Sequence, residues 1–368
     1  MGGGIIGCSI AFHLAKAGVC PLILEKASVA AEASSGGAGL LSSQAHTDEG
    51  GPLFDLKLAS NALYRDLAAE LHERTDTDIE LRPLGHLVPA FGPEDAALIR
   101  RRVSWQSARG LTARWLAAAE ARDFEPGLPE TLQGAGWFPD DHHVNPTAVT
   151  QGLAGAVTRL GGQVRVACPV SSLLLDGERV AGVRTAEGPI AAGVVVLAAG
   201  AWSGEFQQSV GIPIPVLPAK GQIAVARLPE PALRHVAYEQ IYVIPRATGE
   251  HIIGSTVEYV GFDKAVTVEG IAALLADATR IVPGLREAEM VTSYGCLRPA
   301  STDGMPLLGP VPGRPGLVLA TGHFRNGILL APITGQLIAE YILSGRPSMP
   351  LESFRPDRPF PPGPPPQD

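Results

Sequence analysis

A glycine-rich motif at the N-terminus constrains the fold more than any other feature of the sequence. Gly2, Gly4 and Gly7 fit the pattern G-x-G-x-x-G, and the helical pattern that follows ends at Gly18. A short apolar strand is expected next, and Glu25 stands at its end. In such a βα unit the glycines let the backbone approach a pyrophosphate at a helix N-terminus, and an acidic residue about 20 positions further on binds a ribose hydroxyl. The motif therefore predicts a dinucleotide-binding α/β domain.

No strand precedes these glycines, because the sequence starts at Met1. A strand that ends in valine or isoleucine is normal at this position, and the valine codon GTG also serves as a bacterial start codon. Only five of the 29 basic residues are lysines, a bias that indicates GC-rich coding and favours a GTG start. We therefore expect that Met1 is read from such a codon and that the natural chain begins about one strand earlier.

Charge and composition exclude several classes of function. With 37 acidic and 29 basic residues the net charge is −8, so we do not expect the basic surface that nucleic-acid phosphates require. The four cysteines include no C-x-x-C pair, which predicts neither a zinc site nor a disulfide framework and favours the reducing cytoplasm. The sequence has no leader pattern and no apolar run of about 20 residues, so neither a signal peptide nor a membrane span is expected.

The polar run 140–143, Asp-Asp-His-His, contains residue types that bind metal ions. Neighbouring residues on an extended segment point to opposite sides, so the four side chains are not expected to converge on one ion. We therefore expect a polar turn over 140–143 and no metal site in the protein.

The remainder of the chain alternates between helical and strand patterns. Apolar spacing predicts helices over 56–71, 94–108 and 145–160. Strands are expected over 81–91, 163–166, 170–175, 180–185, 189–190 and 193–200, followed by antiparallel strands over 216–257. These patterns predict an α+β region beside the α/β region. The Pro-rich end, 355–368, is expected to be unstructured or polyproline-like.

Two further glycine-bounded segments are candidate contacts for a nucleotide. Small residues fill the loop 33–39, where the backbone can approach a ligand closely. The turn that starts at Gly322 enters an apolar helical run through Leu343. A turn into a helix N-terminus offers free N–H groups to an anion, so the second segment predicts another contact with the same cofactor.

Several blocks of the sequence are typical of one known family. They are 2–25, 199–204, 217–221, 242–246, 295–309 and 320–332, of which the last is the most discriminating. Through these blocks the chain resembles the D-amino-acid oxidase-like FAD-dependent oxidoreductases, and among them the glycine oxidases of thiamine biosynthesis. The resemblance covers nearly the whole chain.

The resemblance implies an α/β plus α+β fold. A discontinuous, Rossmann-like FAD-binding domain would comprise residues 1–45, 143–212 and 296–348, with its first β-strand missing from the chain. A substrate-binding domain with an antiparallel sheet would comprise 46–142 and 213–295. Residues 349–368 would form a Pro-rich tail.

The resemblance also implies which residues contact the FAD cofactor. The pyrophosphate and ribose would lie near Glu25, the adenine would meet the backbone of Val170, and the isoalloxazine would lie against residues 323–329. The full expected set is Gly2, Gly4, Ile5, Ile6, Gly7, Glu25, Lys26, Ala33, Ser34, Ala38, Gly39, Leu40, Val170, Gly200, Trp202, Gly322, His323, Phe324, Arg325, Asn326, Gly327, Ile328 and Leu329. FAD is expected to be non-covalent, but related sarcosine oxidases join a cysteine near this position to the flavin, so a bond through Cys296 stays open.

By the same resemblance, Arg298 binds the substrate carboxylate, because a planar guanidinium can hold a carboxylate with two hydrogen bonds. Tyr242 would donate a further hydrogen bond to it. The implied reaction transfers a hydride from Cα of glycine, sarcosine or a small D-amino acid to the flavin and yields a 2-oxo acid, ammonia or an amine, and hydrogen peroxide. No obligatory protein base is implied, so His323 is not assigned as one. Lys220 and Arg325 are candidates for tuning the flavin.

Two alternative functions stay open. One is an FAD-dependent dehydrogenase of D-amino or 2-hydroxy acids that passes electrons to an acceptor other than oxygen. The other is a non-catalytic or apo flavoprotein, which loss of the first strand would favour. The expected partners are a small amino-acid substrate, oxygen or another electron acceptor, and further copies of the chain in a homo-oligomer.

Overall fold

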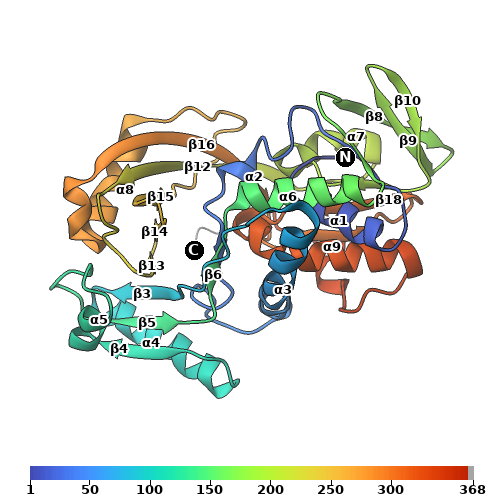
Figure 1. Ribbon diagram of the computed structural model, residues 1–368. Helices are drawn as coiled ribbons and strands as arrows, with labels where there is room; N and C mark the ends of the chain where they lie inside the picture. Colours follow the sequence, from blue (N-terminus) through green and yellow to red (C-terminus); the bar gives the residue numbers. More distant parts are fainter. Residues whose placement is uncertain (364–368) are drawn as a thin grey trace.

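An eight-stranded sheet forms the lobe on the left of Figure 1. The structure, a computed structural model, describes residues 1–363. In spatial order the strands are β16 (Glu289–Ser301), β12 (Val216–Arg227), β15 (Glu250–Gly254), β14 (Tyr242–Pro245), β13 (Val236–Tyr238), β3 (His86–Ala90), β5 (Gly134–Phe138) and β4 (Arg114–Ala117). All neighbours are antiparallel except β13 and β3, which are parallel. Three helices pack on this sheet: α4 (Pro93–Ala108), α5 (Ala118–Phe124) and α8 (Val268–Ile281).

The second lobe contains short parallel strands. β1 (Leu22–Leu24) pairs with β7 (Gln163–Arg165), and β11 (Val195–Leu197) pairs with β18 (Leu317–Thr321), to which β17 (Leu307–Pro310) adds antiparallel. The backbone of Met1 and Gly2 lies between the two groups of strands. The Met1 amine donates to the Val196 carbonyl at 2.8 Å, and the Gly2 N–H donates to the Leu24 carbonyl at 2.8 Å. The first two residues thereby connect the two groups of strands.

Four helices pack together in this lobe: α1 (Ile5–Lys16), α3 (Pro52–Thr75), α6 (Pro146–Arg159) and α9 (Gly327–Ser344), as Figure 1 shows. The helices α1 and α9 approach closely because Gly335 has no side chain, and a Cβ there would lie 2.2 Å from the Ser9 hydroxyl oxygen. That hydroxyl donates to the Ala331 carbonyl at 2.7 Å. The segment Phe324–Ser344 is long and apolar enough to cross a membrane, but more than half of it is buried against other parts of the protein, which is typical of a core helix.

The remaining elements are short. They are α2 (Ala33–Gly36), β2 (Leu40–Leu41), β6 (His142–His143), α7 (Gln207–Val210), the three-stranded antiparallel sheet of β8 (Val170–Asp176), β9 (Arg179–Thr185) and β10 (Gly188–Ala191), and the 3-10 turns η1 (Gly200–Phe206), η2 (Pro283–Glu287), η3 (Phe324–Asn326) and η4 (Glu352–Phe354). The prediction of an α/β region beside an α+β region with an antiparallel sheet is confirmed.

Two expectations for local structure need correction. The strand expected over 81–91 begins only at His86, because Pro83 lacks an N–H for a sheet ladder. The C-terminal segment 355–363 contains no helix or strand, but it is attached to the fold: Arg358 pairs with Asp303 at 2.7 Å, and Phe354, just before the segment, is buried in the core. Residues 364–368 of the predicted tail lie outside the described residues.

Candidate active site

A cavity of about 450 Å3 is lined by residues of both lobes. One side is formed by the N-terminal motif, the segment 31–40 and the turn after β18. The other side is formed by β12, β14 and β16, which contribute Ile223, Tyr242 and Arg298. Segments that are far apart in the sequence therefore surround one space.

Most residues predicted to contact the cofactor line this cavity. They are Gly2, Gly4, Ile5, Ile6, Glu25, Lys26, Ala33, Ser34, Ala38, Gly39, Leu40, Val170, Gly200, Trp202, His323, Phe324, Arg325, Gly327 and Ile328. The exceptions are Gly7, Gly322, Asn326 and Leu329. Gly7 packs on the backbone of Gly2, where a Cβ would lie 2.1 Å from the carbonyl oxygen, and Leu329 is part of the hydrophobic core. Gly7 and Leu329 thus pack beside the cavity wall, and Gly322 and Asn326 are neighbours in sequence of lining residues.

The N-terminus of α1 points its free N–H groups toward the cavity. Gly4 is the N-cap residue and has no side chain that could cap the helix. The Ser34 hydroxyl accepts from the Ile5 N–H at 2.9 Å. At Gly2, φ is +104° and a Cβ would lie 2.3 Å from the Ala198 carbonyl oxygen, so only glycine fits. Because Gly4 cannot cap the helix and Ser34 takes up only the Ile5 N–H, this N-terminus with its positive partial charge remains a site for an anion such as a pyrophosphate.

Glu25 lies beside this helix end and is 8% exposed. Its Oε2 accepts from the Gly3 N–H at 2.7 Å, and its Oε1 accepts from the Ala27 N–H at 2.8 Å. A carboxylate offers about four acceptor positions, so Glu25 retains capacity for ligand hydroxyls.

Charged and aromatic side chains close the rim near Lys26. The Lys26 ammonium lies 3.1 Å from the ring centroid of Trp202, which stacks on Phe262 with centroids 5.4 Å apart. Glu32 forms ion pairs with Lys26 at 3.8 Å and Lys264 at 3.2 Å. Because residues 262 and 264 belong to the opposite lobe, these contacts join the two lobes at the rim.

Arg298 places a guanidinium at the other end of the cavity. Its Nη2 donates to the carbonyl oxygens of Thr256 and Lys220, and its charge lies 5.8 Å from the ring centroid of Phe324. No carboxylate of residues 1–363 forms an ion pair with Arg298. A guanidinium that lines a cavity without a carboxylate partner can bind an anionic ligand there.

Tyr242 lies beside Arg298 and is buried. Burial raises the pKa of Tyr242, although the charge of Arg298 and a hydrogen bond with Ser255 act in the opposite direction. The phenol therefore stays protonated and can donate a hydrogen bond. The structure brings Arg298 and Tyr242 together in the cavity.

Sequence reasoning missed several cavity residues of the same region: Ile223, Tyr238, Gln240, Ser255 and Val257. Ile223 lies within β12, Tyr238 ends β13, Gln240 lies between β13 and β14, and Ser255 and Val257 follow β15, so these residues meet only in the folded sheet. The only signal in the sequence was the strand alternation over 216–257, which does not show which strand ends face a cavity.

Comparisons with known proteins identify the family. The family model described as "FAD dependent oxidoreductase" matches residues 1–341. The chain belongs to this family. It is 36% identical over 345 residues to the glycine oxidase of Geobacillus kaustophilus (strain HTA426), covering 93% of this chain and 91% of that protein. The crystal structure of glycine oxidase from Geobacillus kaustophilus superposes with a TM-score of 0.94 and covers 98% of this chain and 97% of that one.

Two further relatives carry other names. The chain is 36% identical to the bifunctional protein ThiO/ThiG of Nostoc sp. (strain PCC 7120), covering 96% of this chain and 54% of that protein. The crystal structure of iminodiacetate oxidase from Chelativorans sp. BNC1 is 29% identical, with a TM-score of 0.87, and covers 96% of this chain and 97% of that one. Both matches extend over nearly the whole of this oxidoreductase.

The residues of the cavity fit FAD, the cofactor of this family. The glycines at 2 and 7 let α1 approach the strands, and the helix N-terminus faces the cavity beside Glu25. Apolar residues such as Val170 and Ile328 also line the cavity. An anion site, a carboxylate and apolar lining residues suit the pyrophosphate, the ribose and the two ring systems of a flavin dinucleotide.

Cys296 lines the cavity but is held as a neutral thiol. Its Sγ donates to the Gly36 carbonyl at 3.3 Å, and its side chain packs against Gly36, where a Cβ would lie 2.5 Å from the Cys296 Cβ. Burial raises the pKa of Cys296, although the charge of Arg298 opposes this effect. Since the thiolate is the nucleophile, this environment favours non-covalent FAD.

His323 is buried, with 1% exposed, and its Nε2 shares a hydrogen bond with the Thr334 hydroxyl at 3.1 Å. Burial lowers the pKa of His323 to about 3, so the ring is neutral near pH 7. Lys220, expected to tune the flavin, does not line the cavity and pairs instead with Glu258. Arg325 lines the cavity and is exposed, with its charge 5.0 Å from the Phe324 ring centroid.

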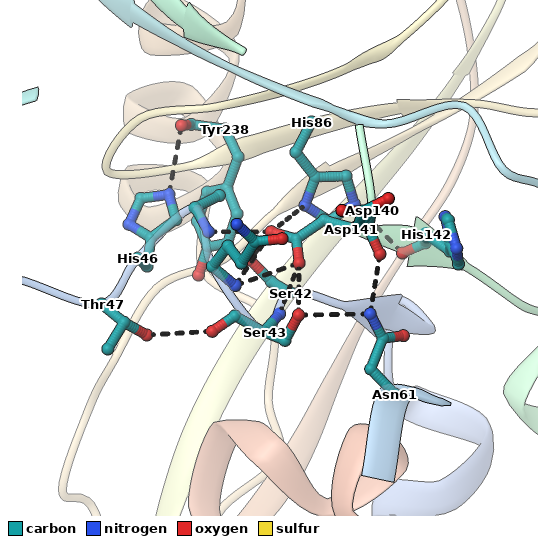
Figure 2. Close-up of polar contacts among 12 residues, drawn as sticks. Ser42, Ser43, His46, Thr47, Asn61, His86, Asp140, Asp141, His142 and Tyr238 are labelled. Atoms are coloured by element: carbon teal, nitrogen blue, oxygen red, sulfur yellow. Dashed lines mark hydrogen bonds and ion pairs between the residues drawn. The ribbon is translucent and has the colours of Figure 1, made fainter. Parts of the chain in front are cut away.

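Asp141 of the polar run 140–143 binds the loop that contains Ser42 and Ser43, as Figure 2 shows. Its carboxylate accepts from the N–H groups of Ser43 at 2.7 Å and Ala45 at 2.8 Å, and from the Ser43 hydroxyl at 2.7 Å. His46, at the end of this loop, stacks on Tyr238 with ring centroids 3.6 Å apart. No cluster of three or more potential metal ligands occurs among residues 1–363. Asp141 therefore holds the loop from which His46 contacts Tyr238, and Tyr238 lines the cavity.

Proposed function

We propose that the protein oxidises glycine and other small amino acids, such as sarcosine and small D-amino acids, with oxygen as the electron acceptor. The products are a 2-oxo acid, ammonia or an amine, and hydrogen peroxide. The observation that carries this proposal is the guanidinium of Arg298, which lines the cavity without a carboxylate partner in residues 1–363. The match to a glycine oxidase over nearly its full length supports this substrate class, as does the likeness to an oxidase named for iminodiacetate, a glycine with a substituted nitrogen.

The residues proposed to hold FAD are those that line the cavity. The N-terminus of α1 holds the pyrophosphate, and Glu25 and Lys26 hold the ribose. The adenine lies near Val170, and residues 323–328 lie along the isoalloxazine. In this assignment 1–45, 143–212 and 296–348 form the FAD-binding domain, and 46–142 and 213–295 form the substrate-binding domain.

Arg298 and Tyr242 fix the substrate by its carboxylate. The guanidinium binds the two carboxylate oxygens, and the protonated phenol donates a further hydrogen bond. Tyr238 lies against Tyr242, with ring centroids 5.8 Å apart, and His46 packs behind Tyr238. These three rings fill the space beside the carboxylate, which restricts the substrate to small side chains.

FAD, when bound, supplies the acceptor for the hydride that leaves the substrate Cα. The chain contributes binding and orientation, which hold Cα–H in one position relative to the cofactor. The positive charge of Arg298 disfavours a protonated amine on the substrate, and the neutral amine is the form that can be oxidised. His323 is not needed as a base, because it is buried and its Nε2 is engaged by Thr334.

The state of the thiols bears on the compartment that we propose. All four cysteines are free in the described part of the chain, which supports the cytoplasm as the proposed location. Assembly into a homo-oligomer stays a prediction.

The test is a peroxide assay on the purified, FAD-loaded protein with glycine, sarcosine and D-proline. We expect peroxide with at least one of them and a rise in KM of about 100-fold or more in Arg298→Ala. Arg227→Ala is the matched control, because Arg227 lies on the same sheet and pairs with Glu250 at 2.6 Å. Oxidation of the substrate by a dye but not by oxygen would favour a dehydrogenase. An unchanged KM in Arg298→Ala would remove this residue from the substrate site.

A further inference from the structure

Lys220 is one of the largest fully buried side chains, with 2% exposed. Its Nζ lies 2.8 Å from Oε2 of Glu258 and donates to the Ala265 carbonyl at 3.2 Å. The two backbones also exchange hydrogen bonds: the Lys220 N–H donates to the Glu258 carbonyl at 2.8 Å, and the Glu258 N–H donates to the Lys220 carbonyl at 2.9 Å. A buried ammonium is tolerated when it is paired. The pair therefore fixes the chain around Glu258 to β12.

Glu258 is also bonded to the residues beside it. Its Oε1 accepts from the Thr256 hydroxyl at 2.6 Å and from Nε2 of Gln222 at 2.8 Å. The Thr256 hydroxyl in turn accepts from the Gln222 N–H at 3.0 Å. Burial opposes the ionised carboxylate, but the hydrogen bonds from Lys220, Thr256 and Gln222 outweigh it and hold the pKa of Glu258 below its usual value. The carboxylate thus fixes Thr256, whose two neighbours in sequence, Ser255 and Val257, line the cavity.

The Arg298 guanidinium is attached to this network through main-chain carbonyls. Its Nη2 donates to the Thr256 carbonyl and, at 3.4 Å, to the Lys220 carbonyl. It lies directly on Gly221, where a Cβ would be 1.8 Å from Nη2. Both acceptors of this nitrogen therefore belong to residues that the Glu258 carboxylate holds in place.

We propose that the Lys220–Glu258 ion pair positions Arg298 for the substrate carboxylate by fixing the Thr256 and Lys220 carbonyl groups. The pair itself touches neither substrate nor cofactor, so Glu258 and Lys220 are positioning residues. This inference rests on the proposed role of Arg298 in carboxylate binding. The proposal also gives a role to Lys220, which is fully buried and does not line the cavity, although it was a candidate for tuning the flavin.

Glu258→Gln in the FAD-loaded enzyme tests the proposal, because glutamine keeps the shape and loses the charge. We expect the KM for glycine to rise about tenfold, with kcat within about twofold. The dissociation constant of acetate, a carboxylate without an amine, should rise by the same factor when followed by flavin absorbance. Glu250→Gln is the matched control. The side chain of Glu250 is 28% exposed, against 29% for Glu258, and the substitution removes the charge with which Glu250 pairs with Arg227, which lies on β12 like Lys220. This variant should leave both constants unchanged.

A double-mutant cycle separates positioning from a general loss of structure. In an Arg298→Ala background, Glu258→Gln should have no further effect on acetate binding. If Glu258→Gln does not fold, Thr256→Val removes one of the hydrogen bonds to the carboxylate, together with the bond that the Thr256 hydroxyl accepts from the Gln222 N–H, and should weaken acetate binding about threefold. Suppose that Arg298→Ala weakens acetate binding, whereas the folded Glu258→Gln or Thr256→Val variant binds acetate as the native enzyme does. This result would overturn the positioning role and leave the proposed function intact. Unchanged acetate binding in Arg298→Ala would overturn both.

Discussion

Tyr242 lies directly against Gly254 on the neighbouring strand. The two residues are paired in register between β14 and β15, and a Cβ at position 254 would lie 2.6 Å from the Tyr242 hydroxyl oxygen. Cβ atoms are essentially never found closer than 3.0 Å to another heavy atom, so the phenol can occupy this place only above a glycine. A glycine inside a strand often marks such a close approach. The missing side chain at 254 thus determines where the hydroxyl lies in the cavity.

Gly254→Ala should displace the phenol and weaken substrate binding. Loss of one hydrogen bond to the carboxylate corresponds to a rise in KM of about threefold to tenfold. Steady-state kinetics with glycine measures this rise, and Tyr242→Phe should produce a similar one. Gly193→Ala is the control, because Gly193 has no atom within 4 Å of an added Cβ. If Gly254→Ala had the KM of the native enzyme, the position of the phenol would not matter for binding.

Asp141→Asn is expected to destabilise the protein by about 3 kcal/mol. The carboxylate accepts hydrogen bonds from the N–H groups of Ser43, Gln44 and Ala45, whereas an amide offers only one acceptor oxygen and turns its NH2 group toward donors. Equilibrium unfolding in urea measures the change in the free energy of unfolding.

Asp140→Asn provides the control for this prediction. Asp140 precedes Asp141, its side chain is exposed, and the contact in Figure 2 uses its backbone carbonyl, which accepts from Asn61 at 2.7 Å. This variant should change stability by less than about 0.5 kcal/mol. Equal effects of the two substitutions would mean that the buried carboxylate does not hold the loop.

Local sequence patterns predicted the parts of the site that are continuous in the chain. The glycine motif, the helix after it and Glu25 lie within 25 residues, and their spacing follows from one βα unit. Arg298 came from the family resemblance, because an arginine before a proline has no distinctive pattern of its own. The structure places both at the cavity.

Contacts between distant strands could not be predicted in the same way. Lys220 was a candidate for tuning the flavin, but its partner Glu258 becomes a neighbour only when the chain returns to β12. Gly221 and Gly254 look like ordinary strand glycines in the sequence. Their role depends on which side chain the adjacent strand places above them, and strand register is set by tertiary packing.

Stability should fall as the pH drops below about 6.5, in part because of His143. Burial, assisted by the charge of Arg246, lowers the pKa of His143 from 6.5 to about 3. Between these two values the unfolded chain binds a proton that the folded protein excludes, so acid favours unfolding. Between pH 7 and pH 5 the free energy of unfolding should therefore fall by about 2 kcal/mol less in His143→Gln than in the native protein. Urea unfolding at both pH values measures this, and the exposed His72→Gln should behave like the native protein.

Acid precipitation should release all of the flavin into the supernatant. Cys296 is 7% exposed, burial raises its pKa, and its Sγ donates to the Gly36 carbonyl, so the thiolate that a bond to the flavin requires is disfavoured. Absorbance of the supernatant and pellet measures the distribution. Cys296→Ser is the control, since a hydroxyl can make the same hydrogen bond, and it should release the flavin in the same way. Flavin that remains with the native pellet and leaves the Cys296→Ser pellet would show that the bond exists despite the buried, neutral thiol.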